Sequence, residues 1–462
     1  MVIKNKKMKV KSICCIGAGY VGGPTMAVIA LKCPEIKVTV VDHNQKKIDL
    51  WNDSDLSKIP VFEPGLAEII EKTRNKNLFF SVNIDQAIED SEMIFMAVNT
   101  PTKTSGLGAG MASDLKYVEK CAKNIRDAAS SKKIVIEKST LPVRTAEKIK
   151  EILNQNSKGI DFEVLSNPEF LAEGTAINDL YKSDRVIIGG DNSKSGKEAT
   201  TLLKNIYKKW IPEEKILTLN IWSAELSKLA SNAMLAQRIS SINSLSFLCE
   251  KTGANINEVS KAIGMDHRIG NKFLNPSPGF GGSCFQKDIL NLVYLCNYYG
   301  LNEVAEFWHQ VVKINDYQRD RLSTLIINEE YNKPNVVTIL GWAFKSDTND
   351  SRESSSIYIT KKLIESGIIV NIYDPSVKKE KIFSDLDHVL EENINYDRIY
   401  IFNNIHNSIE NANSIAILTE WNQFIEFDWK GFVNSKKGKI KIYDFRNIIG
   451  DQLNNYQFYF KI

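Results

Sequence analysis

The feature that most constrains this chain is a glycine pattern close to its first residues. The pattern fits G-x-G-x-x-G, and its residues are Gly17, Ala18, Gly19, Tyr20, Val21 and Gly22. It follows a β-branched run, Ser12–Ile16, and opens a stretch with apolar residues at helical spacing. In that position the glycines are typical of a strand–turn–helix unit whose backbone approaches a dinucleotide pyrophosphate. A tight turn in an α/β domain that binds nothing is the alternative.

An acidic residue after the next predicted strand indicates which dinucleotide would bind. Asp42 follows the run Lys37–Val41, about 20 residues beyond the last glycine. Its carboxylate would accept hydrogen bonds from the adenosine ribose hydroxyls and would repel a 2′-phosphate. No arginine follows that could receive such a phosphate. The sequence therefore favours NAD over NADP.

Short β-branched runs alternate with helical patterns over roughly the first 200 residues. The runs are Ser12–Ile16, Lys37–Val41, Met93–Val98, Lys133–Glu137 and Val186–Gly189, and the helical segments between them include Glu63–Lys72 and Leu115–Ala129. Strands that alternate with helices indicate a parallel sheet with right-handed crossovers.

The rest of the chain falls into two further parts. Residues 223–251 contain no Gly or Pro, which predicts one long helix that ends before Gly253, and more helical segments follow to about Asn332. A second alternation begins at Asn335, where Asp374 closes the second strand as Asp42 does in the first part. Its predicted strands and helix are Val336–Leu340, Ser354–Glu365 (helix), Ile368–Tyr373, Ser414–Leu418 and Ile440–Tyr443.

These patterns predict an α/β fold with two Rossmann-like, doubly wound domains joined by a helical central domain that contains one long helix. The expected bounds are residues 1–218, 219–332 and 333–462. A chain of 462 residues has ample length for two or three domains, each with its own core.

Composition excludes several other classes of protein. A net charge of +3 is too small for a nucleic-acid surface, and the basic cluster 4–11 is expected to be a solvated tail. No apolar run approaches the ~18–20 residues that span a bilayer, so we expect no membrane partner. The seven cysteines are irregularly spaced and the five histidines are scattered. This favours a reducing, cytoplasmic location and no metal site.

A second glycine-rich segment, residues 278–288, predicts a reacting centre. It leads into an apolar-periodic helix expected at Asp288–Tyr299, which places Cys284 at or just before the first helical turn. The positive end of the helix and a nearby lysine would lower the pKa of the Cys284 thiol from its ordinary value of roughly 8.5. The other cysteines lie in apolar patterns typical of packing residues. Taken alone, Cys284 could equally be one of them.

Two more patterns carry polar side chains that need an explanation. Lys228 and Asn232 have i, i+4 spacing and therefore share one face of the long helix, flanked by apolar residues. A lysine facing an apolar interior would need an acid or an oxyanion to balance it. The segment 166–175 holds Glu169 and Glu173. Solvated side chains are the default interpretation of both patterns.

Together these segments resemble the UDP-glucose/GDP-mannose dehydrogenase family, in its eukaryotic-type branch that acts on UDP-glucose. The resemblance runs from about Lys11 to Ile449. Its most specific stretches are GAGYVGGPT from Gly17, VNTPTKT from Val98, SNPEFLAEGTAI from Ser166, ELSKLA from Glu225, RIGNKFL from Arg268 and GFGGSCFQKD from Gly279.

The resemblance implies a function and an assembly. The N-terminal domain would bind NAD, the C-terminal domain would bind the UDP moiety, and the long helix would form the core of a homo-oligomer, either a dimer or a hexamer built as a trimer of dimers. The implied reaction is the four-electron oxidation of UDP-glucose to UDP-glucuronate with NAD, through a thiohemiacetal and a thioester on Cys284.

The resemblance also implies a role for individual residues. Cys284 would be the nucleophile, Lys228 would stabilise the oxyanion, Glu169 would be the general base or acid of hydrolysis, and Asn232 would orient sugar and water, while Asp288 and a water held with Thr140 would handle protons. Beyond the glycine pattern and Asp42, the implied cofactor residues are Lys47, Val98, Asn99, Thr100, Pro101, Thr102, Ser139, Thr140, Glu173, Cys284, Lys287 and Arg352. The implied substrate residues are Glu169, Phe170, Leu171, Ala172, Glu173, Lys228, Asn232, Arg268, Phe273, Asn275, Phe280, Gly281, Phe344, Lys345 and Arg446. Arg268 would reach a neighbouring subunit's site.

Some positions depart from the family pattern. Lys47 and Asn275 stand where Arg and Lys are common, Pro278 would stiffen the substrate loop, and Asn447 stands where a second Arg is usual. These departures affect the expected affinity and regulation more than the chemistry. Two alternatives stay open: the same chemistry on GDP-mannose or UDP-N-acetylmannosamine, and a nucleotide-sugar-binding protein without catalysis.

Overall fold

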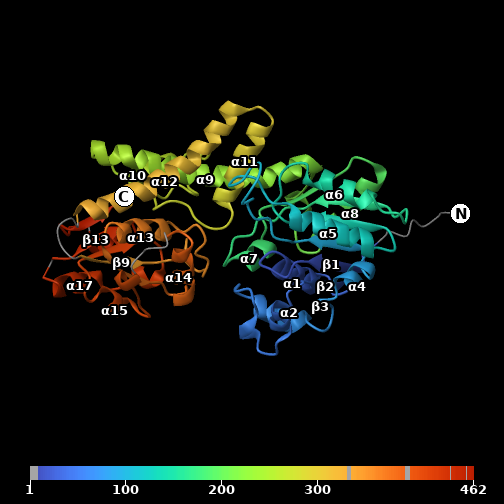
Figure 1. Ribbon diagram of the computed structural model, residues 1–462, viewed down its shortest axis with the longest axis horizontal. Helices are drawn as coiled ribbons and strands as arrows, with labels where there is room; N and C mark the ends of the chain where they lie inside the picture. Colours follow the sequence, from blue (N-terminus) through green and yellow to red (C-terminus); the bar gives the residue numbers. More distant parts are fainter. Residues whose placement is uncertain (1–8, 330–334, 391–395, 438, 454) are drawn as a thin grey trace. The chain divides into compact units, whose positions relative to one another are not determined.

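The structure is a computed structural model that describes residues 9–329, 335–390, 396–437, 439–453 and 455–462. The chain divides into two compact units, Met1–Ser231 and Asn232–Ile462, and the division falls inside the helix α9 (Ile221–Thr252). Each unit contains a Rossmann-like sheet, and helices α9 to α12 follow one another between the two sheets along the chain, so the predicted fold class is confirmed (Figure 1). The predicted domain bounds stay a prediction, and the bound at 332/333 lies outside the described residues.

The described part of the first unit is built on an eight-stranded sheet in the order β3-β2-β1-β4-β5-β6-β7-β8. Its strands are β1 (Ser12–Ile16), β2 (Lys37–Val41), β3 (Leu78–Ser81), β4 (Met93–Met96), β5 (Lys133–Glu137), β6 (Phe162–Ser166), β7 (Val186–Gly190) and β8 (Ile216–Asn220). The helices are α1 (Gly22–Lys32), α2 (Gln45–Asn52), α3 (Leu66–Thr73), α4 (Ile84–Glu89), α5 (Lys116–Ala128), α6 (Thr145–Asn154), α7 (Ala176–Tyr181) and α8 (Lys194–Tyr207).

Strands β1, β4, β5 and β6 are neighbours and run parallel, with every residue of β4, β5 and β6 buried. Continuous burial is what a sheet covered by helices on both faces requires. Because parallel strands end at one edge, the segments that follow these four strands start from that edge. Those segments are the ones that carry the glycine pattern, Val98–Thr102, Ser139–Thr140 and Glu169–Glu173.

The prediction of a purely parallel sheet is wrong at one place. Strands β6 and β7 meet through a single antiparallel pair, Ser166 with Gly189. The connection between them contains a loop and the short helix α7. This helix is shorter than the helix that usually crosses between two parallel strands. Three strands, β3, β6 and β8, were not expected from the sequence. β3 is short and β8 is largely exposed, whereas β6 is as long and as buried as β5.

The second unit repeats the Rossmann strand order on a smaller scale. Its described sheet has the order β11-β10-β9-β12-β13-β14, and all its pairs are parallel. The strands are β9 (Val336–Leu340), β10 (Ile369–Tyr373), β11 (Ile399–Ile401), β12 (Ser414–Ile417), β13 (Lys441–Asp444) and β14 (Tyr459–Lys461). Its helices are α10 (Ile256–Gly264), α11 (Phe285–Tyr298), α12 (Asn302–Glu329), α13 (Ser355–Glu365), α14 (Lys379–Asp387), α15 (Ile405–Ile409), α16 (Asn422–Ile425), α17 (Trp429–Ser435) and α18 (Gly450–Leu453).

The two units share one local device at the end of their first strand. Gly17 and Gly341 both have positive φ, at 114° and 98°, and each donates its N–H to the last residue of the next strand. In each unit the carboxylate after that second strand accepts the N–H that follows the glycine. Asp42 accepts from Ala18 at 3.1 Å, and Asp374 accepts from Trp342 at 2.6 Å. The similarity between Asp42 and Asp374 is therefore a similarity of geometry.

The long helix matches its prediction closely. It spans Ile221–Thr252, and Gly253 follows with φ of 78°, a conformation that ends helices because it costs glycine little. Among the described residues, no helix is both long enough and apolar enough to cross a membrane.

We predict that Asp374→Ala destabilises the second unit. The carboxylate accepts hydrogen bonds from the N–H groups of Trp342, Ala343, Ser376 and Val377 and from the indole of Trp421. Leaving buried donors unpaired costs about 1–3 kcal/mol each, so the thermal midpoint should fall by several degrees. Calorimetry would measure this, with the exposed Asp451→Ala as control. Equal midpoints for the two variants would contradict the prediction.

Candidate active site

The glycine pattern lies between β1 and α1 and leaves room for a ligand. A Cβ at Gly17 would lie 2.2 Å from the carbonyl oxygen of Ala97, and a Cβ at Gly22 would lie 2.0 Å from that of Gly17. These glycines are therefore required by close packing. A Cβ at Gly19 would meet nothing within 4 Å, so the middle of the loop borders open space. Since α1 begins at Gly22, the N–H groups of its first turn start next to that space, as a pyrophosphate site needs.

The Ala18 peptide is held from both sides. Its N–H donates to Asp42 Oδ2 at 3.1 Å, and its carbonyl accepts from the indole Nε1 of Trp51 at 3.0 Å. Lys47 Nζ lies 2.9 Å from the same Asp42 oxygen. Burial raises the pKa of Asp42, but the hydrogen bonds from Lys47, Asn44 and Ala18 outweigh burial and keep the pKa below its ordinary value. The carboxylate is thus ionised and fixed where a ribose would approach.

The loops after β4 and β5 hold each other. Ser139 Oγ donates to the carbonyl of Val98 at 2.7 Å, and Thr100 Oγ1 donates to the carbonyl of Thr140 at 3.2 Å. Thr100 is buried, whereas Asn99 and Pro101 are exposed. The structure thus brings together the predicted nicotinamide-side residues Val98–Thr102, Ser139 and Thr140.

Glu169, Lys228 and Thr140 form a buried polar cluster. Lys228 Nζ on α9 lies 3.1 Å from Glu169 Oε1, Thr140 Oγ1 lies 3.5 Å from the same oxygen, and the N–H of Leu171 donates to Glu169 Oε2 at 2.6 Å. The side chains of Lys228 and Glu169 are only 5% and 8% exposed. The interpretation that Lys228 and Glu169 are solvated side chains is therefore wrong. Burial raises the pKa of Glu169, but Lys228 and the Leu171 N–H lower it below its ordinary value.

The segment that carries Glu169 and Glu173 is anchored at its far end by a residue the sequence analysis did not select. Glu63 is buried and accepts the N–H groups of Gly174 at 2.8 Å and Ala176 at 2.9 Å, at the start of α7. Phe170 lies against the guanidinium of Arg185, with 3.9 Å between the ring centroid and Cζ. The loop is therefore held by packing and hydrogen bonds along its length.

Glu225 performs the same task for the loop after Thr140. This buried residue of α9 accepts the N–H groups of Arg144 and Ala146, both at 2.7 Å, at the start of α6. Burial and the neighbouring Glu225 carboxylate raise the pKa of Glu137, the last residue of β5. Glu225 begins the ELSKLA stretch, but nothing in the sequence indicated its partners.

In the second unit, Cys284 is the residue that directly precedes α11. The helix begins at Phe285, earlier than predicted, and the Cys284 carbonyl accepts the N–H of Asp288 at 2.8 Å. The predicted start at Asp288 is wrong because the glycines end at Gly282, two residues before Cys284, and allow the chain to turn there. Cys284 is partly exposed, whereas the other cysteines are buried. Burial raises the pKa of the Cys121 thiol to about 12, so that thiol is inert.

The first turn of α11 carries a buried carboxylate toward α9. Asn232 Nδ2 donates to Asp288 Oδ2 at 2.6 Å, and Lys287 Nζ lies 3.7 Å from Asp288 Oδ1. Asp288 is 1% exposed and Asn232 6%. Asn232 follows Lys228 by about one helical turn of α9. The predicted residues Asn232, Asp288 and Lys287 are therefore brought together beside Cys284.

The glycine loop before Cys284 is fixed by residues that the sequence analysis missed. Asn315 on α12 accepts the Phe280 N–H at 2.8 Å and donates to its carbonyl at 3.2 Å, and Arg319 Nη2 donates to the same carbonyl at 2.8 Å. A Cβ at Gly281 would lie 2.6 Å from the carbonyl oxygen of Glu353. The signal available in the sequence was an arginine, Arg319, among apolar residues at helical spacing.

Several of the remaining predicted residues of the second unit lie around the glycine loop. Arg446 donates to the carbonyl of Phe344 at 3.0 Å, and the Gly282 N–H donates to the carbonyl of Arg352 at 2.8 Å, so these residues surround the glycine loop. Lys345 Nζ lies 5.8 Å from the Phe344 ring. Phe273 and Asn275 are exposed, and Phe280 is buried.

Two predicted arginines are paired with acids close to them in the chain. The guanidinium of Arg352 binds both oxygens of Asp350, at 2.8 and 2.7 Å, and that of Arg268 binds Asp266 at 2.6 Å. Arg268 is 78% exposed and is not brought against another predicted residue within the described part of its unit. Its proposed role therefore depends on a second subunit.

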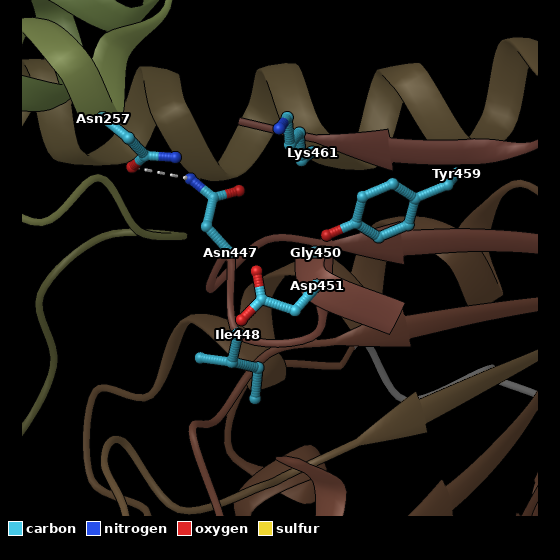
Figure 2. Close-up of a pocket in the computed structure, with 7 residues that line it drawn as sticks. All are labelled: Asn257, Asn447, Ile448, Gly450, Asp451, Tyr459 and Lys461. Carbon is cyan, nitrogen blue, oxygen red and sulfur yellow. Dashed lines mark hydrogen bonds between the residues drawn. The ribbon is translucent and has the colours of Figure 1, made fainter. Parts of the chain in front are cut away.

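Figure 2 shows a polar pocket in the second unit that contains none of the predicted site residues. It is lined by Asn257, Asn447, Ile448, Gly450, Asp451, Tyr459 and Lys461. The Asn447 side chain, which stands where the family often has arginine, donates to the Ile462 carbonyl at 3.0 Å and to Asn257 Oδ1 at 3.4 Å. These hydrogen bonds join Asn447 to α10 and to the residue that follows β14. The neighbouring Arg446 is the arginine that contacts Phe344.

The two units define a class of protein, a dinucleotide-dependent oxidoreductase with a second Rossmann-like unit. The chain belongs to the UDP-glucose/GDP-mannose dehydrogenase family. Residues 11–211 match its NAD binding domain, residues 222–317 its central domain and residues 338–451 its UDP binding domain. The family prediction is confirmed, and NAD is the cofactor. The UDP binding domain indicates a UDP-sugar as the second ligand.

Relatives of known activity are similar over nearly the whole chain. UDP-glucose 6-dehydrogenase of Gallus gallus is 54% identical over 454 residues, which cover 97% of this chain and 91% of that protein. UDP-glucose 6-dehydrogenase 3 of Oryza sativa subsp. japonica is 50% identical over 450 residues, with coverage of 95% and 93%. The structure of a UDP-glucose dehydrogenase from the archaeon Pyrobaculum islandicum has a TM-score of 0.83 at 28% identity and covers 100% of this chain and 99% of that one.

We predict that Asp42→Ala changes the choice of cofactor. Removing the carboxylate removes a ribose acceptor and the charge that repels a 2′-phosphate, and it releases Lys47. The KM for NAD should rise about tenfold, and the preference for NAD over NADP should shrink. Initial rates with both cofactors measure this, with the exposed Asp49→Ala on α2 as control. An unchanged NAD-to-NADP preference would contradict the role of Asp42.

We predict that Lys228→Met is strongly destabilising and that Glu169→Gln partly restores stability in the double variant. Removing one partner of a buried ion pair leaves an uncompensated charge, which costs about 3 kcal/mol. Because the pKa of Glu169 is lowered in the fold, its contribution is present above its ordinary pKa and is lost as pH falls below about 4.5. Urea unfolding at pH 7 and pH 4 measures this. A double variant no more stable than Lys228→Met would argue against the pair.

Proposed function

We propose that this protein oxidises UDP-glucose to UDP-glucuronate with NAD, through two successive oxidations in which Cys284 holds the substrate covalently. The observation that carries the proposal is the setting of Cys284. It is the one partly exposed cysteine among those of the described chain, directly before α11 and at the end of a glycine loop packed by Asn315 and Arg319. The names of the relatives that share nearly the full chain support UDP-glucose as the substrate.

The first oxidation removes a hydride and a proton from the C6 alcohol of the sugar and gives an aldehyde. The Cys284 thiolate then adds to this carbon, so that a C–S bond forms and the oxygen takes a proton, which gives a thiohemiacetal. Loss of a second hydride and of that proton gives a thioester. Water adds to the thioester, the C–S bond breaks, and the thiolate leaves with formation of the carboxylate. Bound NAD supplies the hydride acceptor for each oxidation, and one water is consumed.

The chain's own residues have defined tasks in this proposal. Lys228 would neutralise the oxyanion of the tetrahedral species, since its ammonium is buried and therefore acts in a low dielectric. Glu169, kept ionised beside it, would take a proton from the hydrolytic water. Asp288, held by Asn232, would exchange protons with the substrate oxygen through a water shared with Thr140.

Binding of the two ligands uses separate sets of residues. The Gly17–Gly22 loop, Asp42 and Lys47 would hold the adenosine half of NAD, and the loops around Val98–Thr102, Ser139 and Glu173 would line the nicotinamide half. Lys345 would reach the uridine diphosphate, Arg446 the sugar and Arg352 the NAD pyrophosphate. The guanidinium of Arg352 binds the two oxygens of Asp350 as a fork. The same fork would match a phosphate that took the place of the Asp350 carboxylate.

We further propose that the protein acts as a homo-oligomer. Apolar side chains are exposed along α9, at Trp222, Leu226, Met234 and Leu248, with exposed fractions from 43% to 60%. A helix that exposes several large apolar residues is typical of a face covered by a second copy. The exposed Arg268 would then reach the partner's site, as the family resemblance implies.

We predict a yield of two NADH per UDP-glucose consumed, with NAD in excess and the sugar limiting. Both oxidations at one centre require this ratio, and absorbance of NADH against residual sugar measures it. A ratio of one would mean that the aldehyde escapes, which would contradict the covalent role of Cys284. If no NADH formed, GDP-mannose and UDP-N-acetylmannosamine would be the next substrates to assay.

We predict that Cys284→Ser abolishes the second oxidation. A serine hydroxyl is far less nucleophilic than a thiolate, so steady-state turnover should fall by at least about 100-fold. Cys296→Ala is the matched control, since Cys296 is a buried packing residue of the same helix and should keep most of the activity. A Cys284→Ser variant that turned over like its parent would exclude the thioester.

A further inference from the structure

A buried lysine that the proposed reaction does not use lies in the first unit, close to the catalytic cluster. Lys138 directly follows β5, precedes Ser139 and Thr140, and is 4% exposed. Its ammonium donates to Asn167 Oδ1 at 3.2 Å and to the hydroxyl of Tyr207 at 3.4 Å. Both partners are neutral, so this ammonium is buried without a hydrogen-bonded counter-ion, which is costly unless a nearby charge compensates it.

A second buried lysine on the same strand shows what a structural lysine looks like here. Lys133 begins β5, is 2% exposed, and donates to the backbone carbonyls of Glu89 and Ser91, both at 2.7 Å. It therefore satisfies acceptors that would otherwise be unpaired. Lys138 does not do this, because Asn167 Oδ1 already accepts from the Tyr207 hydroxyl at 2.7 Å. Packing and hydrogen bonding alone give no reason for a charge at Lys138.

The groups that face Lys138 come from several elements. Burial lowers the pKa of Lys138 to about 8, the charge of Glu169 raises it, that of Lys228 on α9 lowers it, and Cys15 on β1 raises it. Tyr207 on α8 faces it as a neutral hydroxyl, since burial raises the pKa of that phenol. In return, the charge of Lys138 lowers the pKa of Glu169. The charges of two buried lysines thus act on Glu169, and Lys228 is the one that lies within hydrogen-bonding distance of it.

Lys138 also fixes the backbone from which Glu169 projects. The Asn167 side chain accepts from Lys138 and Tyr207 and donates through Nδ2 to the carbonyl of Ile187 at 2.7 Å. The Asn167 N–H donates to the carbonyl of Glu137 at 2.9 Å. Asn167 precedes Pro168 and Glu169, so the first part of this loop is held by the residues that surround the Lys138 ammonium.

We propose that Lys138 is a positioning residue for the hydrolysis step: its contact with Asn167 fixes the loop that aims Glu169, and its buried positive charge adds to that of Lys228 on the Glu169 carboxylate. This inference rests on the proposed function for the step it serves, but the electrostatic pairing exists in the free protein. The support is present at neutral pH, where Lys138 is charged, and is lost as pH rises through about 8.

The first experiment is a double-mutant cycle in the free enzyme, without substrate. It compares thermal midpoints of the parent, Lys138→Met, Glu169→Gln and the double variant, at pH 7 and at pH 9.5. We expect the effects to be non-additive at pH 7 and to approach additivity at pH 9.5, where the ammonium has lost its proton. Additive effects at both pH values would overturn the proposal whatever the substrate proves to be. Lys138→Gln replaces Lys138→Met if that variant does not fold.

The second experiment measures pH–rate profiles with UDP-glucose and NAD. Lys138→Met should lower kcat by about 10- to 100-fold with little change in either KM, and should move the acid limb of the profile to higher pH, because Glu169 takes up a proton more easily. Its thermal midpoint should stay close to that of the parent. Lys133→Met is the matched control and should lower the midpoint without moving the acid limb.

Two results would overturn the role of Lys138 in catalysis. One is a Lys138→Met variant with the parent's kcat and acid limb. The other is a loss of activity that only parallels a loss of stability, as expected for Lys133→Met. Failure of the proposed function would instead appear in the parent enzyme, as absence of NADH from UDP-glucose, while the cycle in the free protein would still decide the Lys138–Glu169 coupling.

Discussion

The register of four parallel strands is the constraint on which the first unit depends. Strands β1, β4, β5 and β6 are hydrogen-bonded neighbours, and their carboxyl ends therefore open at one edge of the sheet. Each segment that leaves this edge carries polar residues, and the segments are far apart from one another in the sequence. Full burial of the strands on both faces fixes this register, because a slip would expose apolar side chains. The positions of the glycine pattern and of the buried Glu169 carboxylate follow from it.

At this buried edge, the carboxylates of Glu169 and Glu225 are bound by groups from other segments. Glu169 has Lys228 at 3.1 Å and the N–H of Leu171 at 2.6 Å, while Glu225 is bound by the N–H groups that open α6. The partners of Glu169 keep its pKa below the ordinary value in spite of burial, and they also fix the direction of its carboxylate. The same pairing reduces stability if one partner is removed. The direction of the Glu169 carboxylate and its contribution to stability thus depend on the same partners.

The main feature of the second unit is the partial exposure of one thiol, that of Cys284. The glycines before Cys284 allow the backbone to pass close to Glu353 and Phe344, and α12 holds the loop through Asn315 and Arg319. The other cysteines are buried. Cys284 therefore differs from the other cysteines by its exposure and by its place directly before a helix, which is the setting that the proposed reaction requires.

The sequence by itself determined what depends on neighbouring residues. The G-x-G-x-x-G turn, Asp42, the bounds of β1, β2, β5 and β9, and the long helix follow from local spacing, and specific stretches identified the family. Only the tertiary structure decided the rest, because the contacts join distant positions. Glu63 caps α7 from 113 positions away, and Glu225 reaches α6 across 79. Strands β3, β6 and β8 and the environment of Lys138 were not predicted from the sequence either. A lysine after a buried strand carries no local sign of whether it faces water or an acid, since burial is set by what other segments bring to it.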